Sequence, residues 1–178
     1  MSSPKLKMTA RLAAVGALTL GLSGCFRPLY GPTASGESLP SVLAAIEVDK
    51  VTTSLPQERV GHYLRSELVY DRNGSGVPAP KRYKLNLSFV ERVQSPIVDT
   101  STGRAQSATL TGELTYKLTS LDGQTVITSG TATGYVTYDR SPQRFATVRA
   151  ARDADIRLAK TLADQMRTRL AAALATRT

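Results

Sequence analysis

The stretch LTGELTYKLT at residues 110–119 alternates apolar and polar side chains with a period of two. Such alternation is typical of a β-strand that buries one face and exposes the other to water. Asp122 and Gly123 follow it and are the residue types that a tight hairpin turn favours. Residues 125–138 are therefore predicted as the returning strand. Its inward face carries small residues that would let a helix lie close to the sheet: Gly130, Ala132 and Gly134.

Two further strands and a helix are predicted on the N-terminal side of this hairpin. Residues 83–89 alternate in the same way, and residues 44–51 carry a shorter apolar pattern that indicates a first strand. Between them, residues 55–71 place apolar side chains at helical spacing. Ser54 and Gln57 fit a capping box, in which the Ser54 hydroxyl binds the first-turn amides and the Gln57 side chain reaches back.

A long helix is predicted to close the chain. Ser141 and Pro142 suit its N-cap and first helical position, and it runs to about Ala173. Its apolar side chains follow one stripe: Phe145, Val148, Ile156, Ala159, Ala163, Met166 and Leu170. Arg152 falls on a position of this stripe, which indicates a local kink or a stripe that begins only at Ile156. The element order β-α-β-β-β-α predicts an α+β fold, a two-layer sandwich in which two helices cover one face of about four mostly antiparallel strands. The opposite, threonine-rich face would meet solvent or a partner.

The N-terminal region has the pattern of a bacterial targeting segment. Lys5, Lys7 and Arg11 precede an apolar run at residues 12–22, which is too short to span a membrane as a helix. The run ends in Leu22-Ser23-Gly24-Cys25, which resembles the lipobox of bacterial lipoproteins. Such proteins are acylated on the cysteine and cleaved just before it.

These features divide the chain into three predicted parts. Residues 1–24 are a cleaved signal peptide, residues 25–42 a lipidated anchor and tether, and residues 43–178 the folded domain. Cys25 is the only cysteine of the chain and the predicted acylation site. The alternative is an ordinary signal peptide with a chance cysteine. Phe26, in place of an aspartate after the cysteine, favours sorting to the outer membrane.

Charge and composition narrow the possible functions. The chain carries 23 Lys and Arg against 14 Asp and Glu, and removal of residues 1–24 leaves a net charge of +6. This charge favours acidic partners, and a tethered envelope protein meets lipid headgroups and lipopolysaccharide phosphates rather than nucleic acid. One cysteine and one histidine exclude a disulfide framework and Cys- or His-rich metal centres. The sequence lacks HExxH, P-loop and Gly-x-Ser-x-Gly motifs, so neither an enzyme nor a cofactor is predicted.

Two stretches carry a family resemblance. Residues 25–31 (CFRPLYG) and the closing helix at residues 145–155 and 162–170 resemble the LptE family of lipopolysaccharide-assembly lipoproteins, in its alphaproteobacterial form. The middle strands match that family in pattern only. The resemblance implies a lipid-anchored outer-membrane protein that faces the periplasm and the barrel lumen. It also implies that the protein plugs the LptD β-barrel, helps it to assemble, and binds lipopolysaccharide during insertion into the outer leaflet.

Basic residues near one end of the predicted sheet are the candidate ligand site. Residues 94–107 form a polar turn between two strands and carry Arg104. The resemblance implies a basic residue for lipopolysaccharide binding in this region, and Arg104 lies near that place. Arg140, Arg144 and Arg149 bracket the start of the closing helix and could join the same end. Arginine suits phosphate because its guanidinium group makes paired, charge-assisted hydrogen bonds. The alternative is that these are solvated surface charges.

A second function class shares the anchor and the small α+β domain: an auxiliary lipoprotein of an envelope lipid ABC transporter. Co-purification with an outer-membrane β-barrel would indicate LptE, and co-purification with an inner-membrane permease would indicate the transporter. An anchored hydrolase is disfavoured because the sequence offers no candidate catalytic triad.

Replacement of Cys25 by alanine is expected to abolish acylation and to leave an unprocessed or soluble periplasmic protein. The reason is that the thiol is the predicted acyl acceptor, and stable anchoring needs more than one acyl chain. Mass spectrometry of the mature N-terminus in the wild type and in Cys25→Ala tests this. An unmodified Cys25 in the wild-type protein, or cleavage at another bond, would contradict the lipoprotein prediction.

Overall fold

The computed structural model describes residues 32–54, 57–73, 79–95 and 97–176, with only the backbone for residues 70–73. Its elements are α2 (Leu39–Ala44), β1 (Ile46–Thr52), α3 (Glu58–Asn73), β2 (Tyr83–Gln94), β3 (Ser107–Ser120), β4 (Val126–Asp139) and α4 (Arg144–Ala175). Cys25 and the predicted signal peptide lie outside the described residues and stay predictions. Within the described ranges, no helix combines the length and apolar character that crossing a membrane requires.

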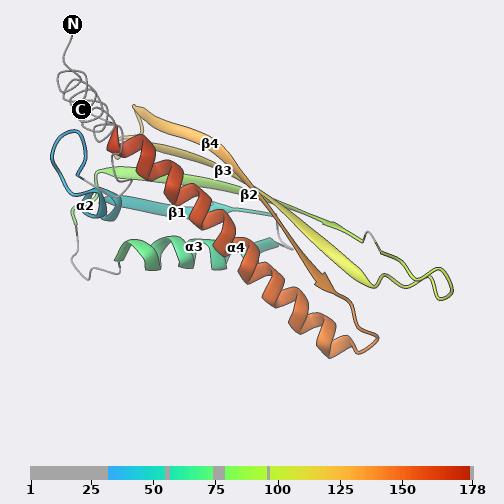
Figure 1. Ribbon diagram of the computed structural model, residues 1–178. Coiled ribbons are helices and arrows are strands. Elements are labelled where there is room, and N and C mark those ends of the chain that lie inside the picture. The colour runs from blue at the N-terminus through green and yellow to red at the C-terminus, as the bar shows by residue number, and fades with distance from the viewer. Residues whose placement is uncertain (1–31, 55–56, 74–78, 96, 177–178) are drawn as a thin grey trace, which may run out of the picture.

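The strands form one sheet in the order β1-β2-β3-β4. β1 runs parallel to β2, whereas the β2–β3 and β3–β4 pairs are antiparallel. Figure 1 shows α3 and α4 together on one face of this sheet. The predicted α+β, two-layer fold is confirmed, with α2 as an additional short helix before the first strand.

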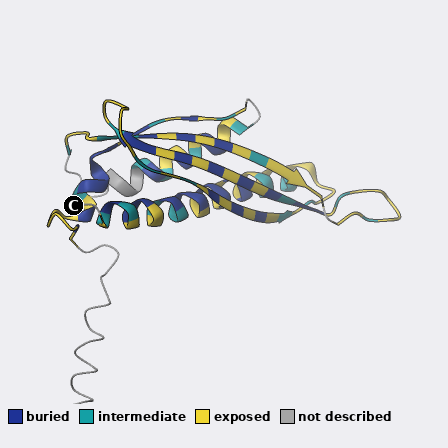
Figure 2. Cartoon of the chain, turned by 90° about the horizontal axis from the view of Figure 1, so that it is seen from above, coloured by how far each residue is buried: buried dark blue, intermediate teal, exposed yellow. Residues whose placement is uncertain are grey.

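Each strand buries one face because its sequence alternates. Figure 2 shows this as stripes of buried and exposed residues along the strands. The face beneath the helices carries most of the sheet's buried side chains: Leu85, Leu87, Phe89, Leu110, Leu114, Tyr116, Leu118 and Val136. The opposite face carries exposed threonines, of which Thr109 and Thr137 bring their hydroxyl oxygens within 3.0 Å of each other. That face is mostly polar, as predicted, and Val90 and Tyr135 are exposed apolar residues on it.

α4 lies close to the sheet because two strand positions opposite it are glycines. A Cβ atom at Gly112 would lie 3.0 Å from the Phe89 side chain and 3.1 Å from those of Leu158 and Leu162. A Cβ atom at Gly134 would lie 3.4 Å from both leucines. The prediction of a shallow strand face beneath a helix is confirmed, and the closest approach lies one strand further in, on β3.

The predicted tether contains the start of the fold. α2 begins after Ser38, whose hydroxyl accepts a hydrogen bond from the Ser41 amide, and Leu39 is fully buried. The Ala34 amide also donates to the Ala175 carbonyl at 3.2 Å, which ties this segment to the end of α4. A stretch rich in Ser and Pro suits a helix N-terminus as well as a linker, because both residue types are favoured at the first helical positions.

Gln57 does not close the predicted capping box. Its side-chain amide donates to the Glu91 carbonyl at 2.9 Å and accepts from the Glu91 N–H at 3.0 Å. Both bonds join the start of α3 to β2, which is 34 residues away along the chain. The Gln57 side chain, which the local pattern assigned to the helix cap, therefore bonds to the backbone of β2 instead.

The long helix begins later than predicted and buries a different set of residues. Gln143 is its N-cap and forms no side-chain capping bond, while the Ser141 hydroxyl accepts from the Gln143 amide in a turn before the helix. In the predicted stripe, Ala159, Ala163, Met166 and Leu170 are buried, but Phe145, Val148 and Ile156 are exposed. The reason is that α4 extends past the N-terminal end of α3, which covers only its later turns (Figure 1).

Replacement of Gly112 by alanine is expected to lower the free energy of unfolding by about 1–3 kcal/mol, because the new methyl group overpacks a filled contact. Gly134→Ala is the matched control, since it adds the same group beneath the same leucines at an ordinary contact distance. It should leave stability unchanged or raise it by about 0.4–1 kcal/mol through the unfolded state. Denaturant unfolding of both variants measures the difference. Equal effects of the two substitutions would contradict this packing.

Candidate functional site

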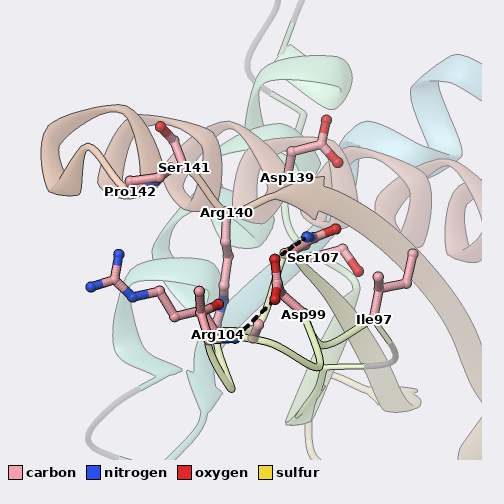
Figure 3. Close-up of a pocket in the computed structure, with 11 residues that line it drawn as sticks. Ile97, Asp99, Arg104, Ser107, Asp139, Arg140, Ser141 and Pro142 are labelled. Atoms are coloured by element: carbon pink, nitrogen blue, oxygen red, sulfur yellow. Dashed lines mark hydrogen bonds between the residues drawn. The ribbon is translucent and has the colours of Figure 1, made fainter.

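A hollow of about 540 Å³ lies at the end of the sheet where β2 turns into β3 and β4 leads into α4. Arg104, in the turn between β2 and β3, and Arg140, which directly follows β4, both line it. Figure 3 shows the Arg140 side chain pointing from the β4–α4 connection toward the turn that carries Arg104. The fold therefore brings together two arginines that are 36 positions apart in the sequence.

Asp99 holds the turn between β2 and β3 in shape. Its carboxylate accepts hydrogen bonds from the Ser101 hydroxyl at 2.6 Å and from the Ser101 and Thr102 amides at 2.9 Å. Gly103 then adopts a φ of +66°, and the Arg104 carbonyl accepts from the Asp99 amide at 2.8 Å. The hydroxyl and amide bonds lower the pKa of Asp99 to about 2, because they stabilise its ionised form. The turn that positions Arg104 thus keeps its charge in any mildly acidic medium.

Two polar atoms at the hollow are buried and have no hydrogen-bond partner in the described part of the chain: Nε of Arg140 and Oγ of Ser107. A buried polar group that forms no hydrogen bond lowers the stability of the folded state by about 1–3 kcal/mol. An oxygen-rich ligand that reached them would recover that cost. Ser107 is the first residue of β3 and only 4% exposed, so its hydroxyl points into a place that the fold has already desolvated.

The charge balance of the hollow is mixed. Asp99 and Asp139 line it together with the two arginines. The Asp99 carboxylate is occupied by its own turn, and it also accepts from the Gln106 side chain at 3.3 Å. Arg104 and Arg140 form no salt bridge with any residue that the structure describes. Both guanidinium groups are therefore available to an anion.

Arg144 and Arg149 do not line this hollow. Both are exposed on the first turns of α4, and the Arg149 guanidinium carbon lies 5.9 Å from the centre of the Phe145 ring. Of the three arginines that bracket the start of the helix, only Arg140 joins Arg104. A sequence signal for this existed: Arg140 ends the strand that returns to the same end of the sheet as the Arg104 turn.

Comparison with known proteins identifies the family. A family model described as LptE, lipopolysaccharide-assembly, matches residues 43–170. The chain belongs to the LptE family. This confirms the resemblance drawn from residues 25–31 and from the closing helix. LptE proteins are lipopolysaccharide-assembly lipoproteins of the cell envelope and are not enzymes.

Solved structures resemble this chain to different degrees. A candidate lipoprotein from Caulobacter crescentus CB15 is similar with a TM-score of 0.61 and 25% identity, over 78% of this chain and 97% of that chain. For a minor lipoprotein from Acinetobacter baumannii, the TM-score is 0.48 and the sequence identity 13%, over 73% of this chain and 92% of that chain. For rare lipoprotein B from Shewanella oneidensis, the TM-score is 0.43 and the sequence identity 12%, over 70% of this chain and 96% of that chain. Among curated proteins, none matches.

Proposed function

We propose that this LptE-family protein is an outer-membrane lipoprotein that binds lipopolysaccharide phosphate at the Arg104–Arg140 hollow, and that it plugs the LptD β-barrel and helps it to assemble. The observation that carries the ligand site is the pair of arginines without ion-pair partners in the described chain, together with the buried, unpaired Nε of Arg140 itself and the buried, unpaired hydroxyl of Ser107 beside them. Family membership supplies the ligand class.

The chemistry of the hollow suits a phosphate group. A guanidinium group offers N–H donors in a planar fork that matches phosphate oxygens. The Ser107 hydroxyl and the Arg140 Nε add donors that the protein leaves unused. Arg144 and Arg149 lie outside the hollow and contribute by charge alone, which is screened beyond a Debye length of about 8 Å at physiological salt. Arg104 and Arg140 are therefore the residues on which specific phosphate binding would depend.

The outer face of the sheet supports a place inside a barrel. Exposed threonines occupy neighbouring positions on β3 and β4: Thr111, Thr115, Thr131, Thr133 and Thr137. Large outer-membrane barrels have polar interiors, so a surface rich in hydroxyl groups would exchange hydrogen bonds with the lumen wall. Acylation of Cys25 would hold the domain at the same membrane.

Replacement of Arg104 by aspartate is expected to weaken lipopolysaccharide binding about tenfold or more, since hydrogen bonds to charged groups contribute about 1.5–3 kcal/mol. Arg144→Asp is the matched control, because it makes the same charge change on an exposed residue outside the hollow. Binding to immobilised lipopolysaccharide at low and high salt measures both, with thermal unfolding to confirm that stability stays within about 0.5 kcal/mol. Unchanged affinity of Arg104→Asp at low salt, or equal losses in both variants, would contradict a specific site.

Depletion of this protein in its own bacterium is expected to lower the amount of correctly assembled LptD. It should also raise the permeability of the outer membrane to large antibiotics, because an unplugged or misassembled barrel no longer maintains the lipopolysaccharide layer. Immunoblots of LptD and growth inhibition by a large antibiotic are the measurements. Normal LptD assembly after depletion, or purification with an inner-membrane permease in place of a barrel, would contradict the barrel role.

A further inference from the structure

The two edges of the sheet differ in how far other parts of the chain bond to their outward backbone groups. An edge strand presents a row of backbone N–H and C=O groups that can pair with a strand of another chain. On β4, side chains of α4 donate hydrogen bonds to three backbone carbonyls along this row: Arg157 to Thr137, Gln165 to Thr133, and Arg169 to Thr131. The β4 edge is thereby covered along most of its length.

The opposite edge is formed partly by β2, because β1 is shorter. β1 has 7 residues and β2 has 12, and their pairing ends at Thr52 and Ser88. β2 continues to Gln94 with β3 as its only partner strand in the described chain (Figure 1). The next rung is closed by the Gln57 side chain, whose two hydrogen bonds occupy the N–H and C=O of Glu91. The backbone groups of Glu91 therefore point to the β1 side, away from β3.

Val93 is the next residue whose backbone groups point to this edge. In an antiparallel pair, alternate residues of a strand turn their N–H and C=O toward the partner and away from it. Because Glu91 faces away from β3, so does Val93. No described residue bonds to the outward N–H or C=O of Val93. Its side chain is 53% exposed, and Ile97 and Val98 in the following turn are 55% and 48% exposed. Unpaired backbone groups and an exposed apolar side chain thus occur together at Val93.

We propose that this open edge of β2, residues 92–94, docks an extended segment of a partner protein, which adds to the sheet as a strand beyond the end of β1. Hydrogen bonds to the Val93 N–H and C=O would fix the register, and side chains at alternate positions would give selectivity. An apolar side chain of the segment would pack on Val93. The proposal is independent of the lipopolysaccharide hollow and needs neither of its arginines.

The charges at this edge indicate an acidic segment. Arg92 is exposed on the other face of the same strand and forms no salt bridge with a described residue. Arg59, near this edge on the helix side, already pairs with Asp155, so Arg92 is the arginine whose charge stays unmatched there. A second copy of the chain would bring the same arginine and, after the predicted cleavage, a net charge of +6, whereas an acidic segment would neutralise Arg92.

A synthetic peptide with alternating glutamate and valine, acetylated, amidated and fluorescently labelled, is the probe. Purified full chain in detergent is titrated into it, and amide hydrogen exchange reports on Val93. Two isomeric control peptides carry N-methyl groups on either the valine or the glutamate amides. One isomer, and only one, should lose about tenfold in affinity, because it loses edge hydrogen bonds that contribute about 0.5–1.5 kcal/mol each. The unmodified peptide should slow exchange of the Val93 amide.

Two variants locate the site. Val93→Gln removes the apolar side chain on which the segment would pack and adds no charge, so it should weaken peptide binding about fivefold or more. Val90→Gln is the matched control: Val90 is 47% exposed on the same strand, pairs with Glu113 of β3, and lies on the opposite face. It should retain the affinity of the wild type.

Several results would overturn the proposal. They are no binding of the unmodified peptide, equal affinities of the two methylated isomers, unchanged exchange of the Val93 amide, or equal losses in Val93→Gln and Val90→Gln. A concentration-dependent dimer that Val93→Gln abolishes would assign the edge to a second copy of this chain, which also overturns it. Loss of lipopolysaccharide binding or of LptD assembly in the Arg104 variant leaves this test unaffected.

Discussion

The close contact of α4 with the sheet at Gly112 and Gly134 determines where the other features of the molecule lie. Fully buried Leu158 and Leu162 fill the space that the two glycines leave, and this fixes a helix of 32 residues across the sheet. Because the helix follows β4 directly, its N-terminal end emerges beside the turn between β2 and β3. The same packing places its side chains along the β4 edge. The contact at the two glycines therefore determines the position of the Arg104–Arg140 hollow and also brings the α4 side chains to the β4 edge.

The start of α3 sets the opposite edge. Asp155 is buried in α4 and accepts a hydrogen bond from Arg59 Nε at 2.8 Å, which fastens the first turn of α3 to the long helix. Burial raises the pKa of the Asp155 carboxyl, and the arginine opposes that shift. With α3 held there, Gln57 reaches Glu91 and closes one rung of β2 but no further one. The open edge at Val93 is a consequence of where this helix begins.

Local patterns predicted the strands and the layer arrangement well, because alternation such as that of residues 110–119 depends on burial of one face alone. They did not settle which part of α4 is covered, because Arg152 interrupts the apolar stripe and left two interpretations, a kink or a stripe that begins at Ile156. Ile156 itself is exposed, since the partner helix α3 is shorter than α4. Side chains that bond far along the chain were also missed: Gln57 was assigned to a cap and bonds to β2. Arg104 was selected from charge and resemblance, and Arg140, Arg144 and Arg149 were placed near the same end of the sheet. Which of these three lines the hollow depends on the path of the β4–α4 connection, which local patterns do not determine.

The central claim is that phosphate of lipopolysaccharide is bound in the hollow between the β2–β3 turn and the start of α4. The most direct measurement follows backbone amide signals of the protein by NMR during titration with lipopolysaccharide and with the same lipopolysaccharide after removal of its phosphates. The phosphorylated ligand should shift signals at residues 97–107 and 139–142, and the dephosphorylated ligand should leave them in place. Equal shifts with both ligands, or shifts confined to the threonine face, would contradict the claim.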